Sequence, residues 1–306
     1  MTKINKPILL IIMFLLAVPL VTAQEEETPS MYEVGSFFIT VLPETQQKGN
    51  KDILIGATED MQKQYIPEGT FATAVNAFMI ETPDKTILVD AGLGLKLFSH
   101  LERCEKKKED IDIILLTHMH GDHIGGLLKD GQKSFPEATI YVSQAEYDYW
   151  MNDEIMSALP ENKQKSFINT REMLNAYKDK LRLFVPGETG NTGKELLPGI
   201  KGIAAYGHTP GHTAYLLHAD DEQLLIWGDL THAMDIQIPC PQVAVTYDTD
   251  PVQAIDSRRK ILEYVSENKI RIAGMHIAYP GIGDIRGNSS KGYDFTLLCT
   301  CEGTFR

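Results

Sequence analysis

One stretch of this 306-residue chain decides how the rest is interpreted: residues 117–126 read THMHGDHIGG. Within it, three histidines and one aspartate lie close together, and they are His118, His120, Asp122 and His123. In an extended backbone His118 and His120 would point to the same side, because side chains two positions apart share a face. Adjacent side chains diverge, so Asp122 and His123 are suited to a second metal ion nearby. Imidazole and carboxylate groups at this density are typical of a site for zinc or a related divalent metal.

The residues around this stretch place it at the end of a strand. Residues 111–116 form a nearly continuous apolar run, as a strand buried on both faces requires. Gly121 and the pair Gly125 and Gly126 allow the backbone to turn tightly and to approach the site closely. The sequence therefore predicts a metal-binding loop that directly follows a buried strand.

Short apolar runs bounded by turn residues recur on both sides of the loop and predict further strands. The predicted strands cover residues 37–42, 76–80, 86–89, 139–142, 183–185, 200–206, 214–217, 224–227 and 271–275. The mostly polar residues from 144 to 182 carry scattered apolar anchors and predict two helices or a helical cap. Strands interleaved with helices in this way favour two sheets covered by helices on the outside.

One predicted helix near the end of the chain is well marked. Asp250 suits the N-cap and Pro251 the first helical position. The apolar residues that follow at helical spacing, from Val252 to Val265, are predicted to face the core. Arg258 and its two basic neighbours are predicted to face solvent.

Composition narrows the classes of function. The chain has 29 Lys and Arg against 42 Asp and Glu, a formal charge of −13, so we expect no nucleic-acid partner. Hydrophobic residues make up 43% and charged residues 23%, which excludes a disordered or collagen-like chain. No Pro-rich or Ser-rich linker divides residues 24–306, so we predict a single domain there.

The first 23 residues are predicted to be a secretory signal peptide. Lys3 and Lys6 precede an uncharged apolar stretch, residues 7–21, and small residues up to Ala23 suit a signal peptidase. The stretch is shorter than the ~20 residues that cross a bilayer, so no stable membrane span is expected after cleavage. The chain is therefore expected to be exported, to the periplasm or to the extracellular medium.

Four cysteines are present, namely Cys104, Cys240, Cys299 and Cys301. An exported protein can form disulfides, but four cysteines allow three pairings and the sequence selects none of them. Cys299 and Cys301 alone fall short of the four ligands that structural zinc needs. Free or structural thiols are therefore favoured over a cysteine metal site.

Four further motifs follow one another in the order of a known superfamily. They are LVDAG at 88–92, GHTPGHT at 207–213, WGD at 227–229 and GMH at 274–276. Together with the loop at 118–126 they resemble the motifs of the metallo-β-lactamase superfamily. The resemblance implies an α+β fold, a four-layer αββα sandwich, with the site at the edge between two sheets.

The resemblance also implies which residues would hold two metal ions. One ion would be held by His118, His120 and His208, the other by Asp122, His123 and His276, and both by Asp229. Asp90 would support the site from behind the ligands, and His212 would be a supporting or structural residue. The expected cofactors are two divalent ions per chain, with zinc expected first, although iron, manganese and cobalt accept the same ligands.

Three stretches are similar to a longer lactonase branch, which holds N-acyl homoserine lactone hydrolases and methyl parathion hydrolase-like enzymes. They are WGDLTH at 227–232, DTD at 248–250 and YPGIG at 279–283. The resemblance implies an enzyme that opens small-molecule lactones by attack of a metal-bridging hydroxide, and hence quorum quenching. Asp229 or His232 would deliver the proton to the leaving alkoxide, and Asp122 completes the predicted catalytic set. Neighbouring families suggest a homodimer.

Other activities stay open on the same residues. An arylesterase or phosphotriesterase of the methyl parathion hydrolase type would need only a different pocket. A β-lactamase, a thioesterase and a non-catalytic metal-binding protein are weaker alternatives, because Asp229 argues against the first and the complete ligand set against the last. Four aromatic residues either line a pocket or pack in the core, and they are Tyr141, Tyr147, Tyr149 and Trp150.

Overall fold

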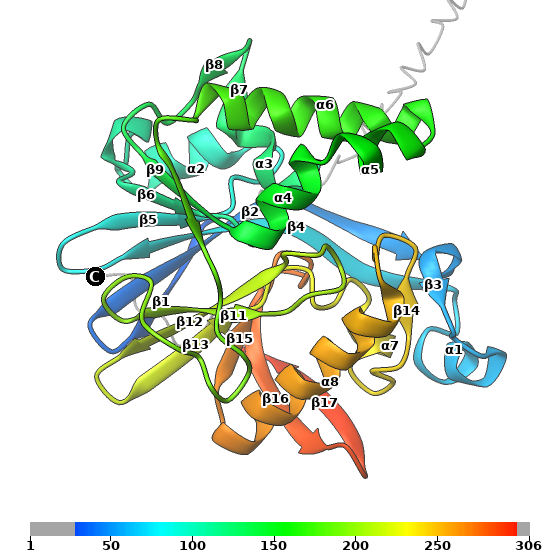
Figure 1. Ribbon diagram of the computed structural model, residues 1–306. Coiled ribbons are helices and arrows are strands. Elements are labelled where there is room, and N and C mark those ends of the chain that lie inside the picture. Colours follow the sequence, from blue (N-terminus) through cyan, green and yellow to red (C-terminus); the bar gives the residue numbers. More distant parts are fainter. Residues whose placement is uncertain (1–27, 299–306) are drawn as a thin grey trace, which may run out of the picture.

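Two β-sheets face each other in the structure, a computed structural model that describes residues 28–298 (Figure 1). The first sheet has the strand order β1 (Ser30–Val34), β2 (Phe37–Asn50), β4 (Thr70–Glu81), β5 (Thr86–Val89), β6 (Ile113–Leu115), β9 (Thr139–Ser143) and β10 (Leu181–Phe184). The second has the order β11 (Ile200–Ala204), β12 (Thr213–Ala219), β13 (Glu222–Ile226), β15 (Arg271–Ala273), β16 (Ile282–Asn288) and β17 (Gly292–Leu297). Two short pairs join β3 (Leu54–Ile55) to β14 (Ala244–Val245) and β7 (Leu128–Lys129) to β8 (Gln132–Lys133).

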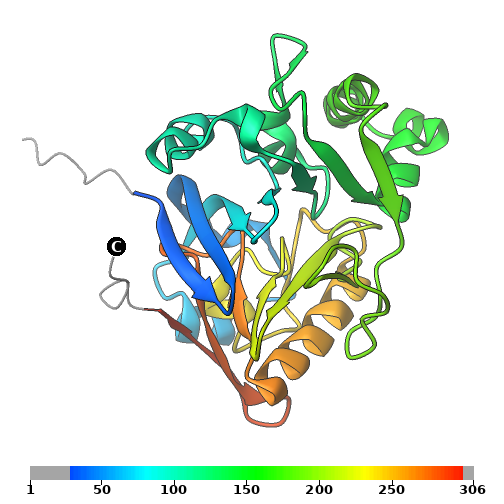
Figure 2. The same cartoon turned by 90° about the vertical axis from the view of Figure 1, so that its left-hand side faces the viewer.

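Within residues 28–298, eight α-helices lie mainly outside the two sheets. They are α1 (Glu59–Tyr65), α2 (Leu97–Arg103), α3 (Gly121–Ile124), α4 (Gln144–Met151), α5 (Asp153–Ala158), α6 (Glu161–Ala176), α7 (Met234–Gln237) and α8 (Pro251–Asn268). In Figure 1 α2, α3, α4 and α6 cover the first sheet, and Figure 2 shows α8 against the second. The layers therefore run helix, sheet, sheet, helix, which confirms the predicted α+β αββα sandwich.

Alternation along the strands produces the layers. On β4, Ala77 and Met79 point to the core beneath the helices, whereas Phe78 and Ile80 point to the core between the sheets. Side chains alternate between the two faces of a strand, so an uninterrupted apolar run can serve two cores at once. Each sheet is buried on both faces for this reason.

The predicted strands all have a counterpart in the structure, although their ends differ. Residues 37–42 are the first part of β2, which continues to Asn50 and becomes more exposed from Gln47 onwards. The chain also forms β1, β16 and β17, which the sequence did not predict. Residues 282–288 read IGDIRGN, with two glycines and two charges, so they lack the apolar pattern from which the other strands were predicted.

Helix α8 begins as predicted, but its buried face differs. The Asp250 carboxylate accepts hydrogen bonds from the backbone N–H groups of Val252 and Gln253, as an N-cap does. Val252, however, is 79% exposed, and Arg258 is only 1% exposed, so both predictions were wrong. The Arg258 guanidinium is buried because it donates to the backbone carbonyls of Leu230, Pro241 and Val243. Charge alone does not place a side chain in solvent when carbonyl oxygens satisfy its donors.

Some predictions concern residues outside the described range. The signal peptide at residues 1–23 lies there, as do Cys299 and Cys301. Cys104 and Cys240 are free thiols. Among the helices of residues 28–298, none is long and apolar enough to cross a membrane.

Candidate metal centre

Strand ends bring the predicted site residues to one edge of the sandwich. Strand β5 is parallel to β6, and β13 is parallel to β15, so the carboxyl ends of each pair lie at the same edge. The loop with His118 follows β6, Asp229 follows β13, and His276 follows β15. Residues more than 150 positions apart in the sequence meet here.

A first group of candidate ligands is formed by His118, His120, His208 and Asp229, whose donor atoms all lie within 4.8 Å of one another. The Nε2 atoms of His118 and His208 each lie 3.0 Å from Nδ1 of His120. Asp229 Oδ2 is 3.2 Å from Nε2 of His208 and 3.6 Å from Nε2 of His118. Three imidazole nitrogens and one carboxylate oxygen thus converge on one point.

A second group is formed by Asp122, His123 and His276. Asp122 Oδ2 lies 3.8 Å from Nε2 of His123 and 3.6 Å from Nε2 of His276. Asp229 reaches this group too, because its Oδ1 is 3.1 Å from His123 Nε2 and its Oδ2 is 3.0 Å from His276 Nε2. The side chain of Asp122 is 32% exposed, whereas the other members are buried.

These donor atoms fit a pair of divalent cations. Ligands about 2.0–2.1 Å from a tetrahedral ion are about 3.3 Å apart, close to the separations in the first group. His123 Nε2 and Asp229 Oδ1 are buried without a well-directed hydrogen bond, which is costly unless another partner satisfies them. The structure therefore brings all seven predicted ligands together, and their coordination of metal stays a prediction.

Hydrogen bonds behind the ligands fix which ring nitrogen faces the centre. Asp90 Oδ2 is 2.6 Å from His123 Nδ1, and Asp248 Oδ1 is 2.9 Å from His208 Nδ1. His276 Nδ1 donates to the carbonyl oxygen of Ala74 at 2.6 Å. Each bond occupies Nδ1, which leaves Nε2 of the same ring directed at the centre.

Thr117 extends this support to His118. Its backbone N–H and its hydroxyl donate to the two carboxylate oxygens of Asp90, at 2.8 and 2.7 Å. Since the single hydroxyl proton is used in this way, the hydroxyl oxygen accepts from His118 Nδ1 at 3.1 Å. Asp90 itself adopts a left-handed backbone conformation, with φ of 59°. The supporting role expected of Asp90 matches this geometry.

His212 supports Asp229 rather than joining either group. Its Nε2 accepts the backbone N–H of Asp229 at 2.9 Å, and its Nδ1 donates to the carbonyl of Ala205 at 2.8 Å. Burial and the nearby His208 lower the pKa of His212 to about 3, so the ring is neutral. A neutral ring is required, because only neutral imidazole has the nitrogen acceptor that this contact uses.

His232 lies beside the centre in a third arrangement with Asp229 and His276. Its Nε2 is 3.1 Å from Asp229 Oδ2, and its ring stacks on that of His276 with centroids 4.4 Å apart. The Gln237 amide oxygen accepts the backbone N–H of His232 at 2.7 Å, which fixes this part of the loop. The position suits proton transfer at Asp229 and also a ligand role.

Burial and neighbouring charges set the protonation of the centre. Burial raises the pKa of Asp229, but His123 and His276 outweigh burial and hold that pKa well below its usual range. Burial, with His208 next in importance, lowers the pKa of His120 to about 3. At neutral pH the carboxylate is charged and this imidazole is neutral, which are the forms that bind metal. Burial lowers the pKa of His208, but Asp229 and Asp248 outweigh burial and raise it to about 9, so a metal ion would have to displace a proton there.

A cavity of about 870 Å³ opens over the centre and is lined by Asp122, His208, Asp229, His232 and His276 among others. One apolar wall comes from the helical side and includes Tyr149, Trp150, Leu159 and Phe167. The opposite wall includes Ile53, Phe71 and Val75. Of the four aromatic residues considered from the sequence, Tyr149 and Trp150 line this cavity, whereas Tyr141 and Tyr147 pack beside cores.

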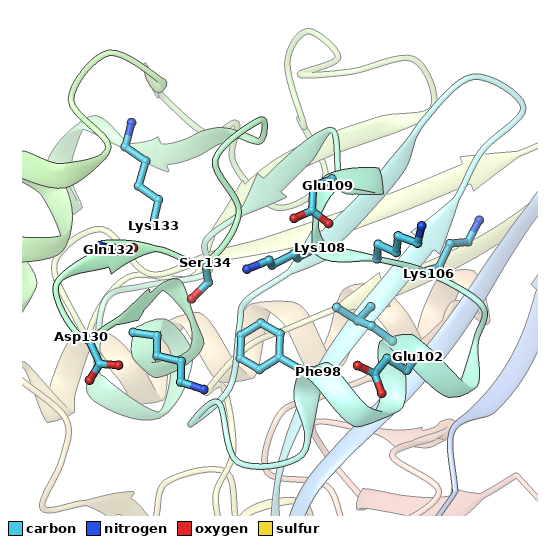
Figure 3. A pocket seen from close by; sticks show the side chains of 12 residues that line it. Phe98, Glu102, Lys106, Lys108, Glu109, Asp130, Gln132, Lys133 and Ser134 are labelled. Atoms are coloured by element: carbon cyan, nitrogen blue, oxygen red, sulfur yellow. The ribbon is translucent and has the colours of Figure 1, made fainter.

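A second cavity, of about 550 Å³, lies away from the centre between α2 and the β7–β8 hairpin (Figure 3). Its lining includes five lysines, three acidic residues and Phe98. Its described lining residues include no histidine, and most of its charged residues are exposed. This cavity therefore has none of the buried donor groups that define the metal centre.

Comparison with known proteins agrees with the geometry. The sequence model of the metallo-β-lactamase superfamily matches residues 70–270, so the chain belongs to this superfamily and is a metal-dependent hydrolase. The solved structure of hydrolase AbOPH is 28% identical, with a TM-score of 0.80 over 90% of this chain and 99% of the other. The dizinc quorum-quenching lactonase AidC is 25% identical, with a TM-score of 0.80 over 89% of this chain and 98% of the other.

A sequence relative with a different activity matches only locally. Exodeoxyribonuclease WalJ of Streptococcus pneumoniae is 53% identical over 53 residues, which are 17% of this chain and 20% of WalJ. The chain thus matches about a fifth of that relative's length. High identity over so short a segment supports the superfamily and carries no substrate to this chain.

The sequence did not reveal every residue that supports the centre. Asp248 was noted in a motif, but its contact with His208 was not predicted. Gln237 and Glu146 were not noted at all, although both are fully buried. Glu146 lies in the stretch QAEYDYWM, at the start of the mostly polar segment that was predicted to be helical. No local pattern distinguishes a buried glutamate there from an exposed one.

Proposed function

We propose that the chain hydrolyses lactones with an acyl side chain, such as N-acyl homoserine lactones. The observation that carries the proposal is the apolar-walled cavity that opens directly over Asp229, His232 and His276. A lactone ring over the polar floor would leave its acyl chain against the apolar walls. The similarity to AidC, solved with an N-hexanoyl-L-homoserine product, supports the same substrate class.

Two ions would be held by the groups described above. His118, His120 and His208 would hold one, Asp122, His123 and His276 the other, and Asp229 both. When bound, such a pair polarises the substrate carbonyl and lowers the pKa of water towards neutrality. Zinc is the metal we propose first, because histidine and carboxylate ligands in this number suit it.

Asp229 and His232 would move the proton that lactone opening requires. The alkoxide that leaves needs a proton, and the donor must be within hydrogen-bond reach of it. Burial and the neighbouring His276 lower the pKa of His232 to about 4, so its ring is neutral at neutral pH. Its Nε2 lies 3.1 Å from Asp229 Oδ2, which gives a short path between the two groups.

The cavity walls would bind the acyl chain. Burial of each methylene contributes about 0.8 kcal/mol, so affinity should rise with chain length until the walls end. Trp150 and Phe167 on one side and Phe71 on the other offer flat apolar surfaces for such a chain. The lining also includes Lys48 and Lys163, so the cavity is apolar along these two walls and not throughout.

The test combines metal analysis with a substrate panel. The chain from residue 24 would be purified, its metal content measured, and its turnover of short-chain and long-chain N-acyl homoserine lactones compared with nitrocefin. We expect about two metal ions per chain and lactone turnover that His118→Ala abolishes. A well-folded chain that binds no metal would contradict the proposed centre.

Aryl ester or phosphotriester hydrolysis is the second candidate. The aromatic side chains of Tyr149, Trp150 and Phe167 would stack on an aryl group as readily as on an acyl chain. Adding an aryl ester and a phosphotriester to the panel separates the two candidates. If a protein with two metal ions hydrolyses only these substrates, the proposed metal centre stands and the proposed substrate class is wrong.

Export is part of the proposal, because a lactonase that acts on external signals would work outside the cytoplasm. The signal-like residues 1–23 support it. Fractionation of cells that express the full chain, with N-terminal sequencing of the product, tests it. A product that keeps Met1 in the cytoplasm would contradict this part alone.

A further inference from the structure

The buried carboxylate of Glu146, on α4, lies between the two loops that carry the histidines of the first group. Its Oε1 accepts the backbone N–H of Met119, between His118 and His120, at 2.9 Å. Its Oε2 accepts the Thr209 hydroxyl at 2.6 Å and the backbone N–H of Gly211 at 3.1 Å, in the loop of His208. One side chain thus joins a loop of the first sheet to a loop of the second.

The burial of this carboxylate is complete. Glu146 is 0% exposed, and its recorded hydrogen-bond partners are all neutral N–H or O–H donors. A buried carboxylate without a cationic partner is costly, and four donors are what make it tolerable. An apolar side chain would fill the same space at lower cost, so the buried carboxylate is best explained by the particular hydrogen bonds that it makes.

Close packing fixes the position of α4 against the loop that carries His208. The Ser143 hydroxyl, just before α4, donates to the carbonyl of Gly211 at 2.7 Å. A Cβ atom at Gly211 would lie 2.1 Å from the backbone nitrogen of Glu146, so only glycine fits there. Since the start of α4 cannot slide along this loop, Glu146 holds the two loops at a fixed separation.

We propose that Glu146 is a positioning residue that sets the affinity of the first group for its metal ion. This inference rests on the proposed metal centre, and it assigns the first group a support that the second lacks. Glu146 has no recorded contact with Asp122, His123 or His276. Loss of its hydrogen bonds should therefore affect one metal ion more than the other.

Trp150 gives this arrangement a spectroscopic readout. Its indole N–H donates to Glu146 Oε1 at 2.7 Å, and its ring meets His120 edge-on with centroids 5.9 Å apart. The chain has one other tryptophan, Trp227, which is fully buried beneath the second sheet. Binding of an ion at His120 should change Trp150 fluorescence, and a Trp227→Phe background isolates that signal.

The main test is Glu146→Gln in the chain from residue 24. Glutamine keeps the shape but replaces one acceptor oxygen with an NH₂ group that faces donors. We expect the affinity of the first group for Zn²⁺ to fall by about 10–100-fold, the range for lost support of a ligand. Under a chelator that leaves two ions on the unsubstituted chain, the variant should keep about one, and the Trp150 signal should shift to higher Zn²⁺.

The matched control is Glu44→Gln. Glu44 is also a buried carboxylate, 1% exposed, that accepts the backbone N–H groups of Leu95, Lys96 and Leu97 at the start of α2. The Glu44→Gln substitution should lower the midpoint of thermal unfolding of the metal-free chain and leave its metal content unchanged. A second variant, Thr209→Val, removes a single donor to Glu146 with little change of shape and should weaken the first ion in the same direction but less.

The outcomes separate the inference from the proposed function. An unsubstituted chain that binds no metal would overturn the centre itself. If that chain binds two ions and Glu146→Gln binds both with unchanged affinity, the positioning role is wrong. Equal loss of both ions would also overturn it, and so would a loss that Glu44→Gln reproduces. If Glu146→Gln does not fold, Thr209→Val decides by the same measurements.

Discussion

The two ligand groups of the centre are supported in different ways, although Asp229 belongs to both. In the second group, His123 and His276 each hold a fixed acceptor at Nδ1, namely Asp90 and the carbonyl of Ala74. In the first group, His120 turns Nδ1 itself to the centre, and within residues 28–298 no hydrogen bond is recorded at its Nε2. In the first group His118 and His208 are oriented in the same way, by Thr117 and Asp248, so the difference lies at His120, whose position depends on where its loop lies. A substitution that moves the loop of His120 should therefore weaken the first ion more than the second.

The largest effect is expected where the two groups meet. Asp229→Ala removes the carboxylate that lies 3.0–3.2 Å from histidines of both groups, so both ions should be lost together. Hydrolysis should fall by about 10³-fold or more, since the centre supplies most of the chemistry. Metal content and kcat/KM measured on the same preparation check this. Asp256→Ala, an exposed carboxylate of α8, is the control and should change neither. Loss of only one ion would show that the groups do not share Asp229.

A smaller effect is expected at His232, which tests proton transfer apart from metal binding. His232→Ala removes the proposed proton carrier but leaves the seven predicted ligands in place. We expect kcat to fall by about 10²–10⁴-fold, the range for a lost acid or base, while about two ions remain bound. Turnover at the original rate with full metal content would remove His232 from the mechanism. A loss of metal would place it among the ligands instead.

Asp90→Asn is expected to act on the second group. The amide can present its NH₂ group to His123 Nδ1 or to Thr117, so one of the present bonds is lost. We expect affinity for one ion to fall by about 10–100-fold. Competition with a chelator, run in parallel on Asp90→Asn and Glu146→Gln, measures this fall in affinity. The comparison is sharpened if Trp150 fluorescence reports a larger loss in Glu146→Gln than in Asp90→Asn, and it fails if both variants give the same signal. Asp90 also supports His118 through Thr117, so some weakening of the first ion is expected as well.

The contrast between the two groups also explains what the sequence could predict. The ligand loop, the strand before it and the later histidine motifs were visible because each combines a local pattern with a buried strand end. The four-layer arrangement, with the site at the edge between two sheets, was accessible through the superfamily resemblance. The burial of Glu146 and Arg258 could not be predicted from the sequence, because it depends on hydrogen bonds to residues at least 15 positions away. Charge at helical spacing predicts exposure, and in both cases distant backbone groups override that tendency.

The edge of the second sheet was missed for a related reason. Strands β16 and β17 pair over residues 283–297, and many of their side chains are exposed. Strand β17 is at the edge and β16 lies between β15 and β17, so backbone hydrogen bonds to neighbouring strands hold these residues despite their low apolar character. The apolar pattern that identified β5 and β6 is therefore absent there. Strands with an apolar run could be predicted, including β10 and β11 at the edges of the two sheets, whereas strands held mainly by backbone pairing could not.

The smallest effect is expected in the cavity wall, away from both ligand groups. Leu159 lines the cavity on the helical side and is not among the candidate metal ligands. In the unsubstituted chain, kcat/KM should rise about fourfold per added methylene, the equivalent of about 0.8 kcal/mol, while the acyl chain lies against this wall. Leu159→Ala should flatten that rise for long chains and leave short-chain turnover and metal content nearly the same. The measurement is kcat/KM across a series of N-acyl homoserine lactones from short to long chains. A uniform loss at every length would instead point to a displaced centre, since α5 packs on α6 and α6 packs on α4, which carries Glu146. Chain-length dependence thus separates the substrate wall from the support of the first group.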